Sequence, residues 1–322
     1  MNQRKKKLLK IAIPLVIGVF FVVISLLRFE AEERQLIWEN VKKADLFWVS
    51  VSVLLGVLSH LSRAYRWHYL LEPLNVKPKF SNSFMSLMFA YLANLGIPRS
   101  GEVLRAVSIS TYEKVNFQES FGTIVTERVI DFIMLLSIVG LTVVLQTDII
   151  LSFFKAQSIN PLITFALMLL LIGIFILGLK ILQRSQHRLI IKVKVFLEGV
   201  LKGMKTILKM KNRIAFIGHT LLIWFLYVAM FVVVKYSVPE TADLGLNVML
   251  VAFVFGSFSM SITNGGIGIY PLTVGASIAL FGGSAVAGES FGWIVWAAQT
   301  LLVVVIGGAS AFLLPLVNKN KI

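Results

Sequence analysis

Long apolar blocks alternate with short polar segments along the whole chain. The clearest blocks cover residues 11–27, 46–62, 122–146, 161–182, 214–236 and 291–314. A helix needs roughly 18 to 20 residues to cross about 30 Å of hydrocarbon, and each block approaches or exceeds that length. Buried core helices of a soluble protein are seldom so long and so numerous. The pattern predicts an all-α fold: a polytopic transmembrane bundle that forms one integral membrane domain over residues 1–322.

Two further blocks are apolar but interrupted. The first, within 81–110, stops at Asn94-Leu-Gly-Ile-Pro-Arg-Ser-Gly-Glu102, and the second, within 247–283, is broken at Thr263-Asn-Gly-Gly-Ile-Gly-Ile-Tyr-Pro271. Short apolar stretches are more typical of re-entrant segments than of full spans. We therefore expect about six full spans plus two broken re-entrant hairpins. Two full spans in place of the second hairpin would satisfy the same pattern of charges.

Composition and charge agree with a membrane protein and orient it. Of the 322 residues, 57% are hydrophobic and 15% are charged, against about 25% charged in soluble domains. The net charge of +15 gathers in the N-terminal segment and in a basic loop over 183–213, so the positive-inside rule explains it without a nucleic-acid partner. The rule places both termini and the basic loop in the cytoplasm. No small-residue cleavage site follows the first block, which we interpret as an uncleaved span.

The two halves of the chain share short sequences at one offset. A shift of 170 residues aligns Asn94-Leu-Gly-Ile97 with Asn264-Gly-Gly-Ile267, and Glu119-Ser-Phe-Gly122 with Glu289-Ser-Phe-Gly292. We therefore predict two pseudo-repeats, 1–150 and 161–318. Each repeat would contain an odd number of crossings, so the second would be inverted, as in secondary transporters whose broken helices meet near the membrane midplane.

The interruptions contain residues suited to non-helical backbone at membrane depth, which is tolerated only inside protein or beside a wet cavity. Glycine permits unusual dihedral angles, proline stops or restarts helices, and the N–H groups of half-helices bind anions. Close helix packing is the alternative role for the glycines. The predicted helix-break residues are Gly96, Pro98, Gly101, Gly265, Gly266, Gly268 and Pro271, and Asn94, Asn264 and Tyr270 beside them are candidate headgroup contacts.

A first group of candidate headgroup-binding residues follows the first interruption. Glu102 and Arg105 are three residues apart and could pair on one helix face. Arg99 and Arg105 suit a phosphate group, because a guanidinium makes bidentate contacts with it. The alternative is an ion pair at the cytoplasmic rim without a substrate.

A second group lies at the start of a span. Glu127 and Asp131 share one helix face at i, i+4, with Arg128 between them. Ionisable groups inside a membrane are costly and usually face a cavity or a partner. Arg128 can neutralise one carboxylate, which leaves the other for a proton, for Arg63 or Arg66, or for a substrate headgroup. The alternative is an interfacial cluster whose side chains reach toward water.

Four segments resemble the family of lysylphosphatidylglycerol synthase transmembrane regions, which are flippase-like membrane proteins. They are Arg63-Ala-Tyr-Arg-Trp67, Pro98-Arg-Ser-Gly-Glu-Val-Leu-Arg105, Glu127-Arg-Val-Ile-Asp131 and Gly265-Gly-Ile-Gly268. The resemblance implies a multi-pass protein of the bacterial cytoplasmic membrane. In the best-known architecture of that family the membrane region flips an aminoacylated phospholipid made by a fused soluble domain, and other members accompany glycosyltransferase domains.

The chain departs from that architecture in two respects. Its longest polar stretch, about 183–213, is too short for an aminoacyl-transfer or glycosyltransferase core. The second interruption runs into Tyr270, where many relatives would carry an acid. The resemblance therefore implies a stand-alone translocator for a phospholipid or a polyprenyl-linked lipid, with membrane lipids as its partners.

Two other functions stay open. One is a membrane-embedded headgroup transferase that uses Glu102, Glu127 or Asp131 as a general base. The other is a non-catalytic subunit that serves a separate lipid-modifying enzyme or glycosyltransferase. The chain has no cysteine, and its four histidines show no ligand spacing, so neither a metal nor another cofactor is expected.

Overall fold

The computed structural model describes residues 19–25, 27–97, 99–146 and 210–319, together with the single residues 16, 170 and 173. The start of the first predicted span, Pro98, the loop 147–160, most of the span 161–182 and most of the basic loop 183–213 lie outside the described residues. Every regular element in the described part is a helix. The fold is therefore the predicted polytopic helical bundle.

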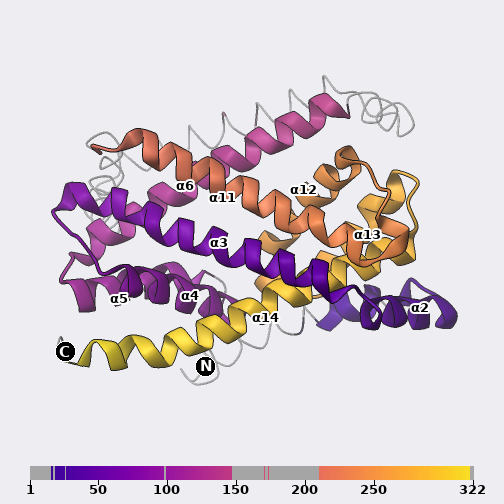
Figure 1. The fold of residues 1–322 in the computed structure, drawn as a ribbon, viewed down its shortest axis with the longest axis horizontal. Coiled ribbons are helices and arrows are strands. Elements are labelled where there is room, and N and C mark those ends of the chain that lie inside the picture. The colour runs from indigo at the N-terminus through magenta and orange to yellow at the C-terminus, as the bar shows by residue number, and fades with distance from the viewer. Residues whose placement is uncertain are drawn as a thin grey trace.

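Four of the helices are long and apolar enough to cross a membrane (Figure 1). They are α3 (Leu46–Leu71), α6 (Phe117–Leu145), α11 (Arg213–Val233) and α14 (Ala285–Val317). Side-chain caps fix where three of them begin. Asp45 accepts a hydrogen bond from the Phe47 backbone N–H, Asn116 accepts from two N–H groups of α6, and Ser284 accepts from the N–H of Ala287. Such caps satisfy N–H groups that a helix start leaves unpaired.

The two interrupted blocks form hairpins of short helices. The first consists of α4 (Phe80–Gly96) and α5 (Ser100–Glu113), and the second of α12 (Leu246–Ile262) and α13 (Ile269–Leu280). In each hairpin the two arms pack on each other. A helix the length of α13 extends about 18 Å, too short to cross about 30 Å of hydrocarbon. The 14 residues of α5 extend only about 21 Å, so the second arm of each block is too short to be a full span.

Backbone geometry at the two interruptions explains the residues found there. Gly265, Gly266 and Gly268 have positive φ angles of 62°, 73° and 72°, which glycine adopts without a steric penalty. In the first hairpin the equivalent turn falls on Arg99, with φ 58°. A Cβ on Gly101 would collide with the backbone carbonyl of Ala90, so this glycine allows α5 to approach α4 closely.

The order of elements in the second half repeats that of the first. A long helix, a hairpin of two short helices and a second long helix occur in α3 to α6 and again in α11 to α14. The lead helices α3 and α11 lie side by side and antiparallel: Ser62 contacts His219, whereas Ser52, ten residues earlier, donates to the carbonyl of Met230. The two lead helices therefore run in opposite directions through the bundle.

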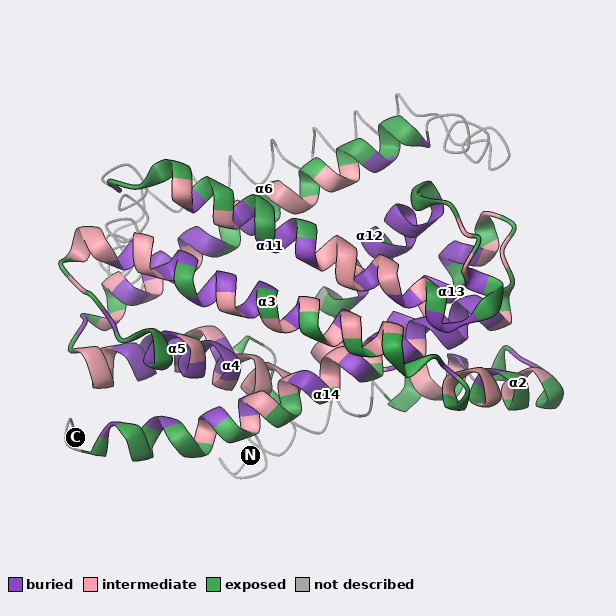
Figure 2. Ribbon diagram, viewed as in Figure 1, coloured by how far each residue is buried: buried purple, intermediate pink, exposed green. Residues whose placement is uncertain are grey.

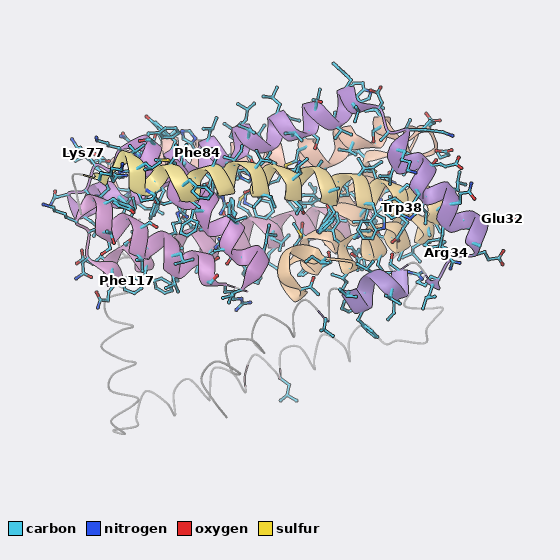
Figure 3. The ribbon with its side chains drawn as sticks, turned by 90° about the horizontal axis from the view of Figure 1, so that it is seen from below. Glu32, Arg34, Trp38, Lys77, Phe84 and Phe117 are labelled. Carbon is cyan, nitrogen blue, oxygen red and sulfur yellow. The ribbon has the colours of Figure 1, made fainter. Side chains whose placement is uncertain are left out.

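The polar ends of the molecule lie far apart. Helix α2 (Ala31–Lys42) covers one end and carries Glu32 and Arg34, while Lys77 lies at the opposite end (Figure 3). Between the ends, large apolar side chains on the outer faces of the helices are exposed (Figure 2). Val144 of α6 is 72% exposed and Phe312 of α14 is 77% exposed. Such an exposed apolar belt is what a hydrocarbon environment requires.

The structure corrects one predicted boundary. The apolar pattern placed the end of the second span near residue 62, but α3 continues as a helix to Leu71. Arg63, Arg66 and Trp67 are all buried between helices, at 3%, 0% and 0% exposure. The helix continues because carboxylates of α6 neutralise its arginines, so these side chains do not need water.

Candidate functional site

Five charged side chains meet inside the bundle. Arg63 and Arg66 come from α3, Arg105 from α5, and Glu127 and Asp131 from α6; we call them the charged cluster. None of these side chains is more than 10% exposed. Charges of this kind are rarely buried unless they are paired.

Hydrogen-bonded ion pairs connect the cluster. Asp131 accepts from Arg63 at 2.6 Å and from Arg66 at 3.0 Å. Glu127 accepts from Arg105 at 2.5 Å and from Arg66 at 3.5 Å. Arg66 therefore bridges the two carboxylates, whose i, i+4 spacing places them on one face of α6 as predicted. The buried position contradicts the alternative of an interfacial cluster that reaches toward water.

Aromatic rings complete the surroundings of the three arginines. The Arg105 guanidinium carbon lies 3.8 Å from the ring centroid of Trp67, and those of Arg66 and Arg63 lie 5.6 Å and 5.8 Å from the rings of Phe216 and Tyr227. These are cation–π distances, and the interaction strengthens away from water. Neither Phe216 nor Tyr227 was a predicted site residue, because nothing in the sequence indicates which ring of α11 will face an arginine of α3.

The cluster carries a surplus of positive charge and of hydrogen-bond donors. Three arginines face two carboxylates, which leaves one net positive charge when all are ionised. The buried Nε atoms of Arg63, Arg66 and Arg105 and the Nη2 atom of Arg105 have no hydrogen-bond partner. A buried donor without a partner costs roughly 1–3 kcal/mol. The cluster can therefore accept an anion with oxygen acceptors.

The cluster lies near one end of the long helices. Residues 46–62 precede Arg63 in α3, and residues 132–145 follow Asp131 in α6. At 1.5 Å per residue these segments extend about 26 Å and about 21 Å, within a hydrocarbon thickness of about 30 Å. The cluster thus lies toward the end of these helices that is predicted to face the cytoplasm.

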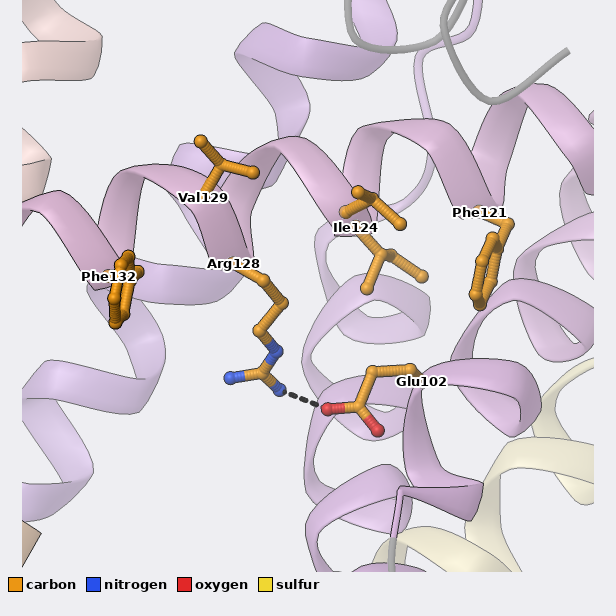
Figure 4. A pocket seen from close by; sticks show the side chains of 7 residues that line it. Glu102, Phe121, Ile124, Arg128, Val129 and Phe132 are labelled. Atoms are coloured by element: carbon orange, nitrogen blue, oxygen red, sulfur yellow. Dashed lines mark ion pairs between the residues drawn. The ribbon is translucent and has the colours of Figure 1, made fainter. Parts of the chain in front are cut away.

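A second ion pair lies outside the cluster. Arg128 of α6 donates to Glu102 of α5 at 2.8 Å (Figure 4). Two ion pairs therefore link α5 and α6: Arg105 of α5 with Glu127 of α6 inside the bundle, and Glu102 of α5 with Arg128 of α6 outside it. The predicted pair between Glu102 and Arg105 is wrong: the close approach of α6 offers each of them a partner that their own helix does not.

The other predicted headgroup contacts do not join the cluster. Arg99 is exposed at the first interruption. The Asn94 side chain accepts from the backbone N–H of Gly101 at 2.7 Å and so stabilises the turn. Tyr270 is buried in an apolar cluster against α12, with its ring near Gly256. Of Asn264 the structure describes the backbone but not the side chain.

The two interruptions nevertheless lie against each other. A Cβ on Gly265 would contact the Leu95 side chain, and the carbonyl of Gly265 accepts from the Trp296 indole at 2.7 Å. Pro271 lies in the first turn of α13, where its missing N–H is not needed. Residues of the two interruptions therefore pack on each other. The charged cluster does not include them and is built from helices of the first half of the chain, α3, α5 and α6.

Two threonines at or beside the cluster were not among the predicted site residues. Thr220 accepts from Arg66 at 3.1 Å, and the Trp67 indole donates to Thr123 at 2.9 Å. Single threonines in apolar helices carry no signal that distinguishes them from ordinary packing residues. Among the described residues, no three His, Asp or Glu side chains come together as metal ligands.

This fold and this site are those of an integral membrane protein that contains two helical hairpins and a buried arginine–carboxylate cluster. The chain matches the lysylphosphatidylglycerol synthase TM region over residues 9–308 and belongs to that family. The family is a membrane domain associated with lipid-related functions, as the sequence motifs implied. No curated protein and no solved structure matches the chain.

Proposed function

We propose that this protein translocates a phospholipid across the bacterial cytoplasmic membrane, with the lipid phosphate bound at the charged cluster during passage. The observation that carries the proposal is the surplus of the cluster: one positive charge and four guanidinium nitrogen atoms without hydrogen-bond partners. A phosphate group supplies the missing negative charge and the missing acceptors, and guanidinium groups bind it bidentately.

Arg105 is the residue best placed to receive the phosphate. Two of its nitrogen atoms are fully buried without partners, against one in each of Arg63 and Arg66. It also lies on α5, the second arm of a hairpin, so a movement of that hairpin would carry it relative to α3 and α6. Helices interrupted in this way line the substrate sites of secondary transporters.

Burial of the cluster requires that it open before a headgroup enters. The side chains of Arg63, Arg66, Arg105 and Glu127 are all 3% exposed or less. In this proposal the structure represents the closed conformation, and a second, open conformation admits the headgroup. In the proposed orientation both chain termini are cytoplasmic, and the cluster binds the phosphate on the cytoplasmic side of the midplane.

The proposal is tested in proteoliposomes that contain a fluorescently labelled phospholipid whose outer-leaflet fraction is bleached by an impermeant reductant. Wild-type protein should expose inner-leaflet lipid faster than protein-free vesicles do. Arg105→Gln should slow this exposure about tenfold or more, because a charged hydrogen bond is worth roughly 1.5–3 kcal/mol.

The matched control is Lys43→Gln at the C-terminal cap of α2, which also removes one positive charge, but from an exposed pair with Glu39. It should leave the rate unchanged. Equal rates for Arg105→Gln and wild type, with both proteins monodisperse, would contradict the assignment of the cluster as the phosphate site.

A further inference from the structure

A groove on the outer surface of α6 ends at the outer ion pair. It has a volume of about 280 Å³ and is lined by Phe121, Ile124, Val125, Arg128, Val129 and Phe132 of α6 and by Glu102 of α5 (Figure 4). The α6 residues recur every three or four positions, so they form one helical face. We call this feature the α6 groove.

The α6 groove combines an apolar surface with one accessible cation. Val129 and Phe132 are 43% and 56% exposed, and the Arg128 side chain is 42% exposed. Arg128 donates to one oxygen of Glu102 through a single nitrogen. The other Glu102 oxygen is buried and has no hydrogen-bond partner. Arg128 therefore has N–H groups outside this pair, and because its side chain is partly exposed an anion can bind them in competition with Glu102.

The position of Arg128 along α6 matches the level of lipid phosphates. Residues 129–145 follow it to the end of the helix and extend about 26 Å, close to the hydrocarbon thickness of about 30 Å. Phe132 lies one turn deeper, where acyl chains begin. The cation and the apolar face thus follow one another in the order in which a phospholipid presents its phosphate and its chains.

From these observations we infer that the α6 groove is a lateral binding site for a phospholipid of the surrounding bilayer, with its phosphate at Arg128 and one acyl chain along the face that ends at Phe132. The volume is below the roughly 300–1,000 Å³ of pockets that enclose a whole small ligand, so the groove holds a segment of the lipid and leaves the rest in the bilayer.

The reciprocal ion pairs connect this site to the charged cluster. Arg128 and Glu127 are neighbours on α6, and Glu102 and Arg105 are one turn apart on α5. A phosphate that displaces Glu102 from Arg128 breaks the outer link between α5 and α6, and Arg105 is the next cation inward. This inference rests on the proposed function, for which it supplies the entry site of the phospholipid from the bilayer.

Because the chain contains no cysteine, a single introduced cysteine can carry a reporter. A fluorophore is attached at Phe132→Cys in the α6 groove or, as a matched control, at Leu141→Cys, which is exposed on the same helix at 52%. Quenching is measured in nanodiscs that contain either phosphatidylglycerol or a phosphate-free diacyl glycolipid, each with brominated acyl chains. The ratio of the two quenching efficiencies reports preference for the phosphate.

We expect the ratio to exceed one at position 132 and to equal one at position 141. In the Phe132→Cys background, Arg128→Gln should lower the apparent affinity for phosphatidylglycerol about tenfold, as loss of a charge-assisted contact does. Glu102→Gln should raise it, because the competing carboxylate is gone. A ratio of one at position 132, or a decrease with both substitutions, would overturn the inference and leave Glu102 and Arg128 as a structural pair.

The quenching experiment does not depend on translocation. Arg105→Gln should leave the quenching ratio at position 132 unchanged while it slows lipid movement. A quenching ratio of one together with normal lipid translocation would reject the α6 groove as a binding site but not the proposed function. A quenching ratio above one without any translocation by the wild-type protein would reject the proposed function but not the binding site.

Discussion

The charge balance of the buried cluster makes a quantitative prediction about stability. Asp131 accepts hydrogen bonds from Arg63 at 2.6 Å and from Arg66 at 3.0 Å. Asp131→Asn keeps the shape of the side chain but removes its charge, so the net charge of the cluster rises from one to two. Breaking a buried ion pair from one side costs roughly 3–5 kcal/mol, because the partner charge is left uncompensated. We expect Asp131→Asn to lower the free energy of unfolding by about that amount.

The matched variant is Arg105→Gln, which lowers the net charge of the cluster where Asp131→Asn raises it. It makes the cluster neutral, since two arginines then face two carboxylates, and Glu127 retains its contact with Arg66 at 3.5 Å. Its cost should be that of one charged hydrogen bond, roughly 1.5–3 kcal/mol. Reversible unfolding of both variants in mixed micelles measures the difference. If Arg105→Gln were as destabilising as Asp131→Asn, the assignment of a positive surplus would be refuted.

Two further predictions concern the packing that positions the cluster. Gly101→Ala should destabilise the protein by about 1–3 kcal/mol, because its Cβ would collide with the Ala90 carbonyl. The control Gly218→Ala, whose Cβ would meet nothing within 4 Å, should be neutral or stabilise α11 by up to about 1 kcal/mol. Equal thermal stabilities of the two variants would show that Gly101 is not needed for the close approach of α5 to α4. Trp67→Phe removes the hydrogen bond to Thr123 and should lower the free energy of unfolding by about 1 kcal/mol. Trp67→Leu also removes the aromatic ring next to Arg105 and should lower it by about 1–2 kcal/mol more. The Trp67→Leu protein should therefore melt at a lower temperature than the Trp67→Phe protein.

Much of the fold could be predicted from the sequence, because a membrane allows few backbone arrangements. Apolar blocks located the four long described helices, and the glycines at 265, 266 and 268 marked a turn that does have positive φ angles. The spacing of Glu127 and Asp131 placed both carboxylates on one face of α6, and both contact Arg66.

The residues that a lipid would meet could not be predicted as well, because ion pairing depends on which helices approach each other. The apolar pattern ended the second span before Arg63, whereas carboxylates of α6 allow α3 to bury both of its arginines. The partners of Glu102 and Arg105 were likewise set by the packing of α5 on α6. Asn94 and Tyr270, which looked like headgroup contacts beside the interruptions, instead stabilise the turn and fill an apolar cluster.

The central claim is that the charged cluster recognises the phosphate of a lipid. The most direct measurement compares, in the same proteoliposomes, the movement of a fluorescent phospholipid with that of a fluorescent glycolipid that has identical acyl chains and no phosphate. We predict that wild-type protein accelerates the movement of the phospholipid and leaves the movement of the glycolipid at the rate found in protein-free vesicles. Equal acceleration of both lipids would contradict it, because the surplus positive charge of the cluster would then play no part in selecting what crosses the membrane.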